Sequence, residues 1–289
     1  MRKVGTYNIS GVTFTTRGEH RYVTINQCGV EATYPFDRPN TVFPVKAVMM
    51  DLDGTTVKSE AFWVYLIQKT IRELTADPGF ALTEEDLPFV SGFSTAEHLQ
   101  YCLTKYRLPY SLAQADDLYH RIAAFELEEI MQGRGNVEAF RPREGLKEFL
   151  LTLKEKGIKI GLATSGLDYK AIPEIVSVFR VLGMGDPTAF YDAVITGGKR
   201  KKPGDYGTLG ELAAKPHPWI YRELALGLGV SPEEAVVVED SSAGLLAGRT
   251  AGCNVVGFAD GNLIQSGLSE ECYAVIRHWK ELLPLLGLT

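Results

Sequence analysis

VMMDLDGT, residues 48–55, is the stretch of sequence that decides the fold. The apolar run over residues 45–50 predicts a buried strand, which ends abruptly in two acidic residues and a glycine. Residues two apart in an extended chain point to the same side, so Asp51 and Asp53 can reach one point beyond the strand, where Gly54 lets the backbone turn away. Two like charges this close are costly unless a cation or a shared proton relieves them. The stretch therefore predicts a divalent metal site, a reacting substrate, or both.

An Asp-X-Asp-Gly turn on its own has a simpler explanation. Acidic turns after strands are common, and Asp51 or Asp53 alone is able to cap the next helix. The strand in front of the turn and the partner motifs farther along the chain favour the functional interpretation.

Bulk properties predict a folded protein that binds neither nucleic acid nor membrane. The chain has 289 residues, of which 45% are hydrophobic and 23% are charged, which is enough for a large core and for two domains. The net charge of −6 gives no support to nucleic-acid binding. No segment approaches the roughly 20 apolar residues of a membrane span.

The cysteines and the first residues indicate a reducing compartment. The four cysteines lack metal-ligand spacing and are interpreted as free thiols: Cys28, Cys102, Cys253 and Cys272. No signal peptide is visible in the first residues, so we expect a cytoplasmic protein. We also expect a monomer or a weak dimer.

Residues 1–44 differ in pattern from the rest of the chain. Short segments rich in Val, Ile, Thr, Phe and Tyr predict strands near 3–9, 12–16 and 21–26, which would form a small meander. Three prolines within residues 35–44 predict an irregular connection. Since no titratable cluster occurs here, we interpret this segment as a structural extension that covers a sheet edge or forms an interface.

The pattern from residue 59 to about residue 133 is helical. Apolar residues recur at spacings of three and four, and breaks fall at 77–79, 91–92 and 108–109. About four helices and no strand are predicted, inserted directly after the acidic turn. We expect this block to lie over the strand end as a lid.

From residue 143 onward helices and strands alternate. Helices are predicted at about 143–156, 168–181, 218–228, 242–251 and 278–286, and strands at 159–163, 193–195, 235–239, 253–258 and 273–276. Strands separated by helices imply parallel βαβ units and a doubly wound α/β sheet. Ligands of such sheets bind beyond the carboxyl ends of the strands.

Polar side chains stand at the predicted strand ends and before one helix. They are Asp51, Asp53, Thr164, Ser165, Lys215, Glu239 and Asp240. This set suits phosphoryl transfer, in which a divalent ion and a lysine neutralise the phosphate, a hydroxyl binds its oxygens and one carboxylate attacks. Each member alone is more often a helix cap or part of a solvated loop. Their common position at one edge of the sheet favours a single site.

Four motifs in this order resemble the signature motifs of the haloacid dehalogenase-like hydrolases. They are DLDGT at 51–55, ATS at 163–165, KPHP at 215–218 and VEDSSAG at 238–244. The nearer resemblance is to the branch that contains β-phosphoglucomutase and small phosphosugar phosphatases. It covers about residues 45–289 and implies a Rossmann-like core with an inserted helical cap domain.

The resemblance implies a role for each motif residue. Asp51 would be the nucleophile and form an aspartyl-phosphate. Asp53 would protonate the leaving oxygen and then activate water as a base. Thr164 would hydrogen-bond a phosphoryl oxygen, with Ser165 and Gly166 as neighbouring substrate contacts.

The other motif residues imply a metal site beside the nucleophile. Lys215 would hold the phosphate and steady Asp51. Asp51, Asp240 and the backbone carbonyl of Asp53 would bind Mg²⁺, a hard ion that prefers oxygen ligands. Glu239 would be a metal ligand or a partner in the ion's water shell.

A second lysine competes with Lys215 for the phosphate. Lys202 also precedes a proline, within the basic run 199–202. A helix begins directly after the Lys215 motif, whereas residues 204–207 are no helix start, so we prefer Lys215. The basic run is interpreted as a solvated loop that is able to meet an anionic substrate tail.

The resemblance leaves open which acceptor takes the phosphoryl group. Water makes a phosphatase, and a sugar hydroxyl makes a mutase. The mutases of this branch carry an arginine where Thr95 stands and a histidine where Trp63 stands. We therefore favour a Mg²⁺-dependent phosphatase of a small phosphorylated metabolite such as a sugar phosphate. A non-catalytic regulator that retains the fold is the third interpretation, and the intact motif residues argue against it.

Several residues of the helical block are candidates for substrate contact: Phe62, Trp63, Phe93, Ser94 and His98. An equally good interpretation makes them the aromatic core of that block. The predicted organisation is a β-rich extension over 1–44, an α/β core over 45–57 and 138–289, and a helical cap over 58–137.

Overall fold

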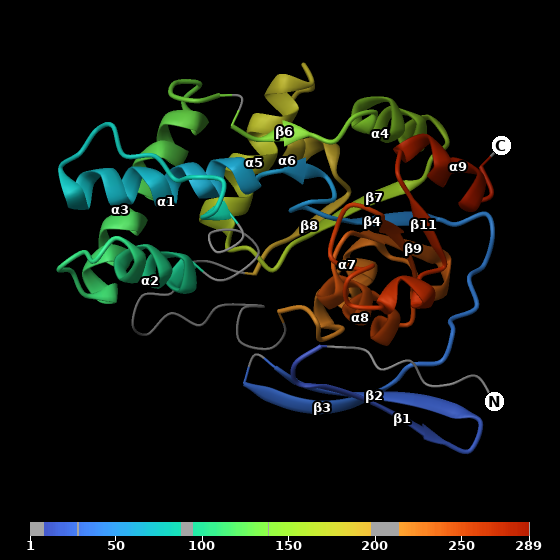
Figure 1. Cartoon of the computed structure of the whole chain (residues 1–289). Helices are drawn as coiled ribbons and strands as arrows, with labels where there is room; N and C mark the ends of the chain where they lie inside the picture. Colours follow the sequence, from blue (N-terminus) through green and yellow to red (C-terminus); the bar gives the residue numbers. More distant parts are fainter. Residues whose placement is uncertain (1–8, 28, 88–94, 138, 198–213, 289) are drawn as a thin grey trace, which may run out of the picture.

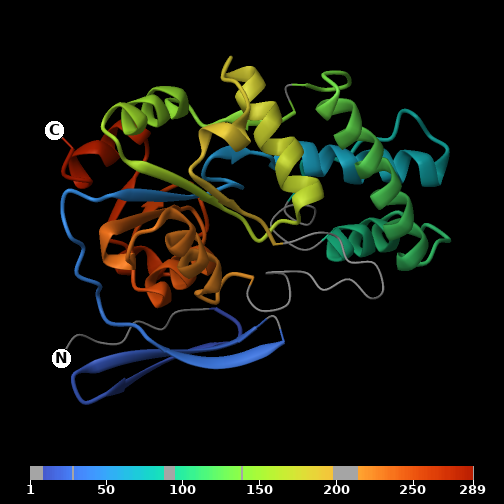
Figure 2. The same ribbon diagram turned by 180° about the vertical axis from the view of Figure 1, so that it is seen from behind.

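The computed structural model describes residues 9–27, 29–87, 95–137, 139–197 and 214–288. In this part of the chain a central parallel sheet is covered by helices on both faces (Figure 1). A block of helices lies at one side, and a small separate sheet lies beneath helices α7 and α8 (Figure 2). We call residues 58–137 the cap and strands β1–β3 the N-terminal sheet, and the limits of the three predicted domains stay predictions.

The central sheet has six parallel strands in the order β11-β10-β9-β4-β7-β8. They are β4 (Ala47–Asp51), β7 (Lys159–Ala163), β8 (Ala193–Ile195), β9 (Ala235–Glu239), β10 (Asn254–Phe258) and β11 (Ala274–Ile276). β4 lies between β7 and β9, so the acidic turn leaves the middle of the sheet. The predicted doubly wound α/β fold is confirmed.

Helices cover both faces because alternate residues of β4 point to opposite sides. The helices and turns of the core are α4 (Leu146–Glu155), α5 (Asp168–Val181), α6 (Pro187–Phe190), α7 (Trp219–Leu228), η2 (Pro232–Glu234), α8 (Ser242–Ala251), η3 (Leu268–Glu271), η4 (Trp279–Glu281) and α9 (Leu282–Leu285). Val48 and Met50 share one buried cluster with α4 and α5. Ala47 and Met49 share the other with α7 and α8.

The cap contains α1 (Glu60–Thr75), α2 (Thr95–Lys105) and α3 (Leu112–Met131). About four helices were predicted, and the described part of the cap holds three. The cap joins the core through an antiparallel ribbon of β5 (Val57–Lys58) and β6 (Arg141–Pro142). The sequence did not predict this ribbon, because two residues per strand are too few to show a period.

A buried carboxylate ties the cap together between α1 and α2. Asp86 is fully buried and accepts hydrogen bonds from the Tyr106 hydroxyl at 2.7 Å, the Thr83 amide at 2.7 Å and the Tyr101 hydroxyl at 2.9 Å. Lys105 forms an ion pair with the same carboxylate. Burial raises the pKa of Asp86, but these partners outweigh it, so that the pKa is held below its usual value.

The N-terminal sheet is an antiparallel meander of β1 (Val12–Arg17), β2 (His20–Gln27) and β3 (Val30–Pro35). The strands predicted near 12–16 and 21–26 are confirmed, and the one near 3–9 lies almost wholly outside the described residues. β3 was missed, although Val30, Ala32 and Tyr34 alternate with polar residues.

This sheet covers the outer side of helices rather than an edge of the central sheet. Val23, Ile25 and Phe36 are fully buried in the same cluster as α7 and α8. The N-terminal sheet is therefore packed against the two helices that follow the Lys215 and Glu239 motifs (Figure 1).

The described cysteines are free, as predicted, and all three are buried: Cys102, Cys253 and Cys272. Cys28 lies outside the described residues. Within the described segments, every helix is too short or too polar to cross a lipid bilayer.

Candidate active site

The turn after β4 brings Asp51 against the end of β9. Asp51 is the last residue of β4 and is 6% exposed. Gly54 has a φ of +79°, and a Cβ atom there would lie 2.1 Å from the Asp240 carboxylate, so only glycine fits. Arg143 holds the turn from behind, because its guanidinium donates to the carbonyls of Gly54 and Thr55.

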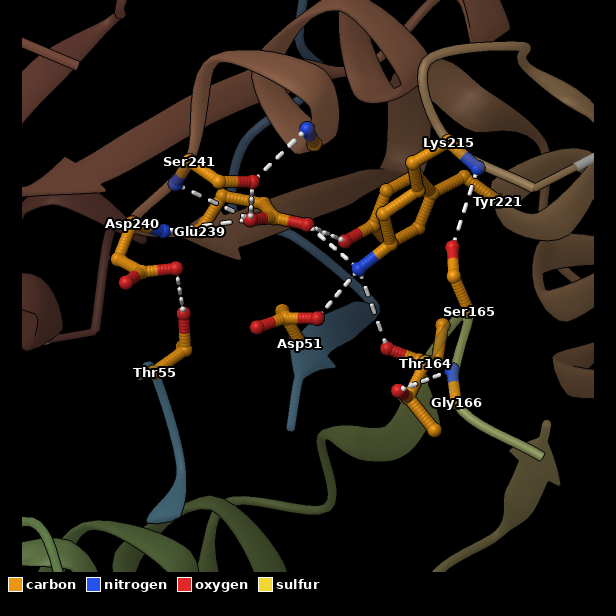
Figure 3. Close-up of polar contacts among 12 residues, drawn as sticks. Asp51, Thr55, Thr164, Ser165, Gly166, Lys215, Tyr221, Glu239, Asp240 and Ser241 are labelled. Atoms are coloured by element: carbon orange, nitrogen blue, oxygen red, sulfur yellow. Dashed lines mark hydrogen bonds and ion pairs between the residues drawn. The ribbon is translucent and has the colours of Figure 1, made fainter. Parts of the chain in front are cut away.

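Lys215 is the residue that joins the separate motifs. Its ammonium forms an ion pair with Asp51 and a second one, at 2.6 Å, with Glu239 (Figure 3). It also lies 3.3 Å from the carbonyl oxygen of Ala163 at the end of β7. The predicted meeting of Lys215 with Asp51 is therefore present, and the competing Lys202 lies outside the described residues.

Glu239 is bound on both of its carboxylate oxygens. Oε1 accepts from Lys215 and, at 2.6 Å, from the hydroxyl of Tyr221. Oε2 accepts from the Ser241 hydroxyl at 3.0 Å and from the Asp240 amide at 3.2 Å. Helix α8 packs so closely here that a Cβ atom on Gly244 would lie 1.8 Å from the carboxyl carbon. Tyr221 was not predicted, because in the sequence it is one apolar position among several on its helix.

Three carboxylates could hold a cation beside Lys215. One oxygen each from Asp51, Glu239 and Asp240 lies within 4.8 Å of the others. Carboxylate oxygens are the ligands that Mg²⁺ prefers, so the donor set fits the predicted ion. Both carboxylate oxygens of Glu239 already accept hydrogen bonds from protein groups. Glu239 is therefore better placed to lie next to the ion than to ligate it directly.

The pKa values of two of these carboxyl groups, Asp51 and Asp240, are raised in the folded protein. Burial, and then the charge of Glu239, raises the pKa of Asp51 well above its usual value, against the opposing effect of Lys215. Burial and Glu239 likewise raise the pKa of Asp240 to about 7. A divalent cation would relieve both effects, because it favours the ionised carboxylates.

The Thr-Ser-Gly motif lies on the other side of Lys215. Thr164 is buried at the end of β7, and its hydroxyl oxygen accepts a hydrogen bond from the Gly166 amide at 2.9 Å. The hydroxyl oxygen of Ser165 accepts from the Lys215 amide at 3.1 Å (Figure 3). Residues 164–166 therefore follow the strand that pairs with β4 at Asp51 and hold the backbone of the lysine loop.

A cavity of about 800 Å³ lies between the core and the cap, and Asp240 of the carboxylate cluster is part of its lining. Asp53 and Gly166 line its core side, and Trp63, His98 and Tyr119 line its cap side. Asp53 is exposed and accepts a hydrogen bond from the Ser59 hydroxyl at 2.6 Å. The second aspartate of the motif thus faces the space that a substrate would fill.

Helix α5 contributes two residues to the cavity that were not predicted. Lys170 lies with its ammonium 4.7 Å from the centre of the Trp63 ring. Glu174 is 2% exposed, and burial together with the nearby Asp53 raises its pKa well above the usual value. The two lie four residues apart on one helix face, which was the only signal the sequence offered.

The cap candidates divide into cavity and core residues. Trp63 and His98 line the cavity, and burial lowers the pKa of His98. Phe62 is 2% exposed and packs against Phe140, with the two ring centres 4.6 Å apart, so it belongs to the core. Phe93 and Ser94 lie outside the described residues.

Comparison with known proteins identifies the family. The model of the haloacid dehalogenase-like hydrolases matches residues 45–252, and the chain belongs to this family. The N-terminal sheet precedes the matched range. Hexitol phosphatase A of Escherichia coli (strain K12) is 29% identical over 211 residues, which cover 73% of this chain and 82% of that protein.

The relatives include proteins named as phosphatases and a protein named as a mutase. β-Phosphoglucomutase of Bacillus subtilis (strain 168) is 29% identical over 234 residues, which cover 75% of this chain and 84% of that protein. A solved hydrolase of subfamily IA from Geobacter sulfurreducens PCA matches with a TM-score of 0.60 and 19% identity, covering 86% of this chain and 100% of that one, and supports the fold alone. The predicted class, a phosphomonoester hydrolase of this family, is confirmed by the family match and the phosphatases among the relatives.

Proposed function

We propose that this chain is a Mg²⁺-dependent phosphatase that hydrolyses a small sugar phosphate or sugar-alcohol phosphate through an aspartyl-phosphate. The observation that carries the proposal is the position of Lys215, in contact with Asp51 and Glu239 and beside Asp240. An ammonium among several carboxylates, next to a cavity that Asp53 and Asp240 line, matches the needs of phosphoryl transfer.

The reaction takes two steps. A carboxylate oxygen of Asp51 attacks phosphorus, the bond to the leaving oxygen breaks, and Asp53 gives that oxygen its proton. Asp53 then removes a proton from water, whose oxygen attacks the phosphorus, and Asp51 is released with inorganic phosphate. The exposure of Asp53 toward the cavity suits both of its roles.

Lys215 and Thr164 would hold the phosphoryl group while this happens. Lys215 favours the ionised form of Asp51 and holds its carboxylate in place, and the Thr164 hydroxyl lies at the neighbouring strand end. Mg²⁺ bound by Asp51, Asp240 and the Asp53 carbonyl would neutralise phosphate charge. Glu239 would orient Lys215 and border the ion.

The charges of the cavity favour a single phosphate on a neutral polar body. Five carboxyl groups and three cationic side chains line it: Asp53, Glu60, Glu174, Asp240 and Asp260 against Lys58, Arg143 and Lys170. One phosphate would be balanced by Mg²⁺, whereas the acidic excess among the described lining residues would disfavour a second. Sugar and sugar-alcohol monophosphates meet this condition, and the relative named hexitol phosphatase A supports the same class.

A mutase remains the second candidate because a β-phosphoglucomutase is among the relatives. A mutase must retain a phosphorylated sugar intermediate while that intermediate reverses its orientation within the site. Trp63 and Thr95, which stand where mutases carry a histidine and an arginine, both line the cavity and supply neither a cation nor an imidazole. Their chemistry favours water as the phosphoryl acceptor.

The test is phosphate release from p-nitrophenyl phosphate with and without MgCl₂. We expect Mg²⁺-dependent turnover that falls about 10³-fold or more in Asp51→Asn, which keeps the side-chain shape and removes the nucleophile. Asp192→Asn, at a surface ion pair with Lys154, is the matched control. Equal activity of wild type and Asp51→Asn would refute Asp51 as the nucleophile, and the absence of Mg²⁺-dependent turnover in the wild type would favour a non-catalytic regulator.

A second measurement separates the two enzyme activities. Hexitol 6-phosphates, hexose 6-phosphates and hexose 1-phosphates are supplied singly, and free phosphate and isomerised sugar phosphate are both measured. Release of phosphate supports the phosphatase. Conversion of hexose 1-phosphate to 6-phosphate without free phosphate would replace it with the mutase.

A further inference from the structure

The N-terminal sheet reaches the loop that carries Lys215. His217, two residues after the lysine, is fully buried. Its Nε2 atom lies 3.1 Å from the carbonyl oxygen of Gln27 at the end of β2, and its Nδ1 atom lies 2.8 Å from the Tyr34 hydroxyl on β3. Both ring nitrogens of a residue in the lysine motif are thus occupied by a sheet that precedes the matched family range.

The partners fix how the imidazole is oriented. A carbonyl oxygen only accepts, so Nε2 carries a hydrogen and donates it to Gln27. In neutral His217 the other nitrogen, Nδ1, then accepts from the Tyr34 hydroxyl. The Tyr34 and His217 rings also meet edge to face, with their centres 5.8 Å apart. The ring is therefore held by hydrogen bonds and by packing.

The loop transmits this restraint to the ammonium over a short distance. Pro216 and Pro218 flank His217, are buried, and have fixed φ angles, so the loop has few conformations. The Lys215 amide is held by the Ser165 hydroxyl at 3.1 Å. A shift of His217 would have to move the backbone of Lys215 or break this contact.

The far end of the sheet is anchored just as firmly. Arg21 forms a two-pronged ion pair with Glu271, at 2.7 and 3.1 Å. Arg249 of α8 donates to the carbonyl of Phe36 at 3.3 Å, and its guanidinium lies 4.8 Å from the centre of that ring. Since both ends are fixed to the core, the Gln27 and Tyr34 contacts with His217 are held in place rather than incidental.

We propose that the N-terminal sheet is a positioning element of the active site. Gln27 and Tyr34 fix the ring of His217, which keeps the Lys215 ammonium between Asp51 and Glu239. This inference rests on the proposed function in that it assigns Lys215 a catalytic role. The sheet contributes no atom to the reaction, and it restricts where the lysine lies.

The test is Tyr34→Phe, which removes the hydroxyl and keeps the ring. The lost hydrogen bond should lower kcat for p-nitrophenyl phosphate about fivefold to tenfold at nearly unchanged KM. Thr33→Val is the matched control, because it removes the 2.8 Å contact between Thr33 and Thr24 on the opposite, exposed face of the same sheet. A merely structural role predicts equal kcat per folded molecule in the two variants, and that result would overturn the inference.

A double-mutant cycle sharpens the test. His217→Leu should lower kcat at least as much as Tyr34→Phe, and Tyr34→Phe should add nothing in the His217→Leu background, because both remove the same restraint. Additive losses would show that Tyr34 acts elsewhere and would contradict the inference. Thermal unfolding of each variant confirms that folded protein is being compared.

Crystal structures of the variants separate this inference from the proposed function. In Tyr34→Phe the Lys215 ammonium should be displaced from, or spread around, its position between Asp51 and Glu239, whereas in Thr33→Val it should not. A displaced lysine in a protein without phosphatase activity would refute the function and leave the positioning role intact. An unmoved lysine in an active enzyme would refute the positioning role alone.

Discussion

The cap and the N-terminal sheet are both attached to the same core, but they serve the site from opposite sides. The cap is inserted between β5 and β6 and presents Trp63, His98 and Tyr119 to the cavity. The N-terminal sheet presents none of its described residues to the cavity and contacts His217, two residues after Lys215. An added region can therefore affect catalysis either by touching the substrate or by fixing the wall of the site.

This difference gives the two regions different expected kinetic effects. Changes on the cap side should alter which substrates bind, and so should appear mainly in KM and in specificity. Changes at the His217 contact should alter the chemical step, and so should appear mainly in kcat. A change that only lowers the stability of the cap should alter neither KM nor kcat of the folded protein.

The largest effect is expected when the lysine on which the N-terminal sheet acts is removed. Lys215→Met keeps the chain length and removes the charge, which leaves Asp51 and Glu239 buried without their counter-ion. We expect kcat for p-nitrophenyl phosphate to fall about 10³-fold. Lys154→Met, at an ion pair on the surface, should leave kcat unchanged.

The same variant tests whether the N-terminal sheet acts through the lysine alone. Tyr34→Phe should have no further effect on the residual activity of Lys215→Met. A further loss would mean that the sheet supports another part of the site, such as Glu239 through α7.

An intermediate effect, on stability alone, is expected in the cap. Asp86→Asn leaves Lys105 without its buried partner and should lower the free energy of unfolding by about 3 kcal/mol at pH 7. Because the pKa of Asp86 is lowered by folding, its contribution is present above the usual aspartate pKa of about 3.9 and is lost as the pH falls through the lowered value. Denaturant unfolding at several pH values should therefore show a gap between wild type and variant that narrows below about pH 4.

Two controls test whether the effect of Asp86→Asn is specific to the buried ion pair and limited to stability. Asp116→Asn, at a partly exposed pair with His120, should change stability by less than about 1 kcal/mol. The folded fraction of Asp86→Asn should retain the kcat of the wild type. A lower kcat in folded Asp86→Asn would show that cap packing and the chemical step are not separable.

The smallest effect is expected at the wall of the cavity. Trp63→Ala removes the ring that lies beside Lys170 and should lower kcat/KM for a hexitol phosphate about fivefold, mainly through KM, since such a contact is worth about 1 kcal/mol. Trp63→Phe, which keeps an aromatic ring, should recover most of the loss. An equal loss in kcat for p-nitrophenyl phosphate would place Trp63 with the chemical step and remove the contrast between the two regions.

Much of the site followed from sequence because it follows from topology. Asp51, Thr164 and Glu239 end parallel strands of one sheet, and such ends must meet at one edge. Lys215 was chosen over Lys202 because a helix begins directly after its motif, and α7 does begin at Trp219. In each case a local pattern was enough to place the residue.

The residues that were missed have partners far away in the chain. Tyr221 looks like a core position of an amphipathic helix until Glu239 is placed beside its hydroxyl. In the sequence Lys170 and Glu174 are an ordinary polar pair on a helix, and only the folded structure places them in one cavity with cap residues. Propensity and periodicity describe a single segment, so they carry no signal for such pairs.

By itself, the sequence determined the α/β core, the helical insertion and the set of groups at the strand ends. These depend on hydrophobic period and chain order, which are local properties. Only the tertiary structure decided that Tyr34 meets His217 across 183 residues and that the N-terminal sheet packs on α7 and α8 rather than on a sheet edge. Which apolar faces pack together depends on shape and burial across the whole molecule, and no single segment specifies that.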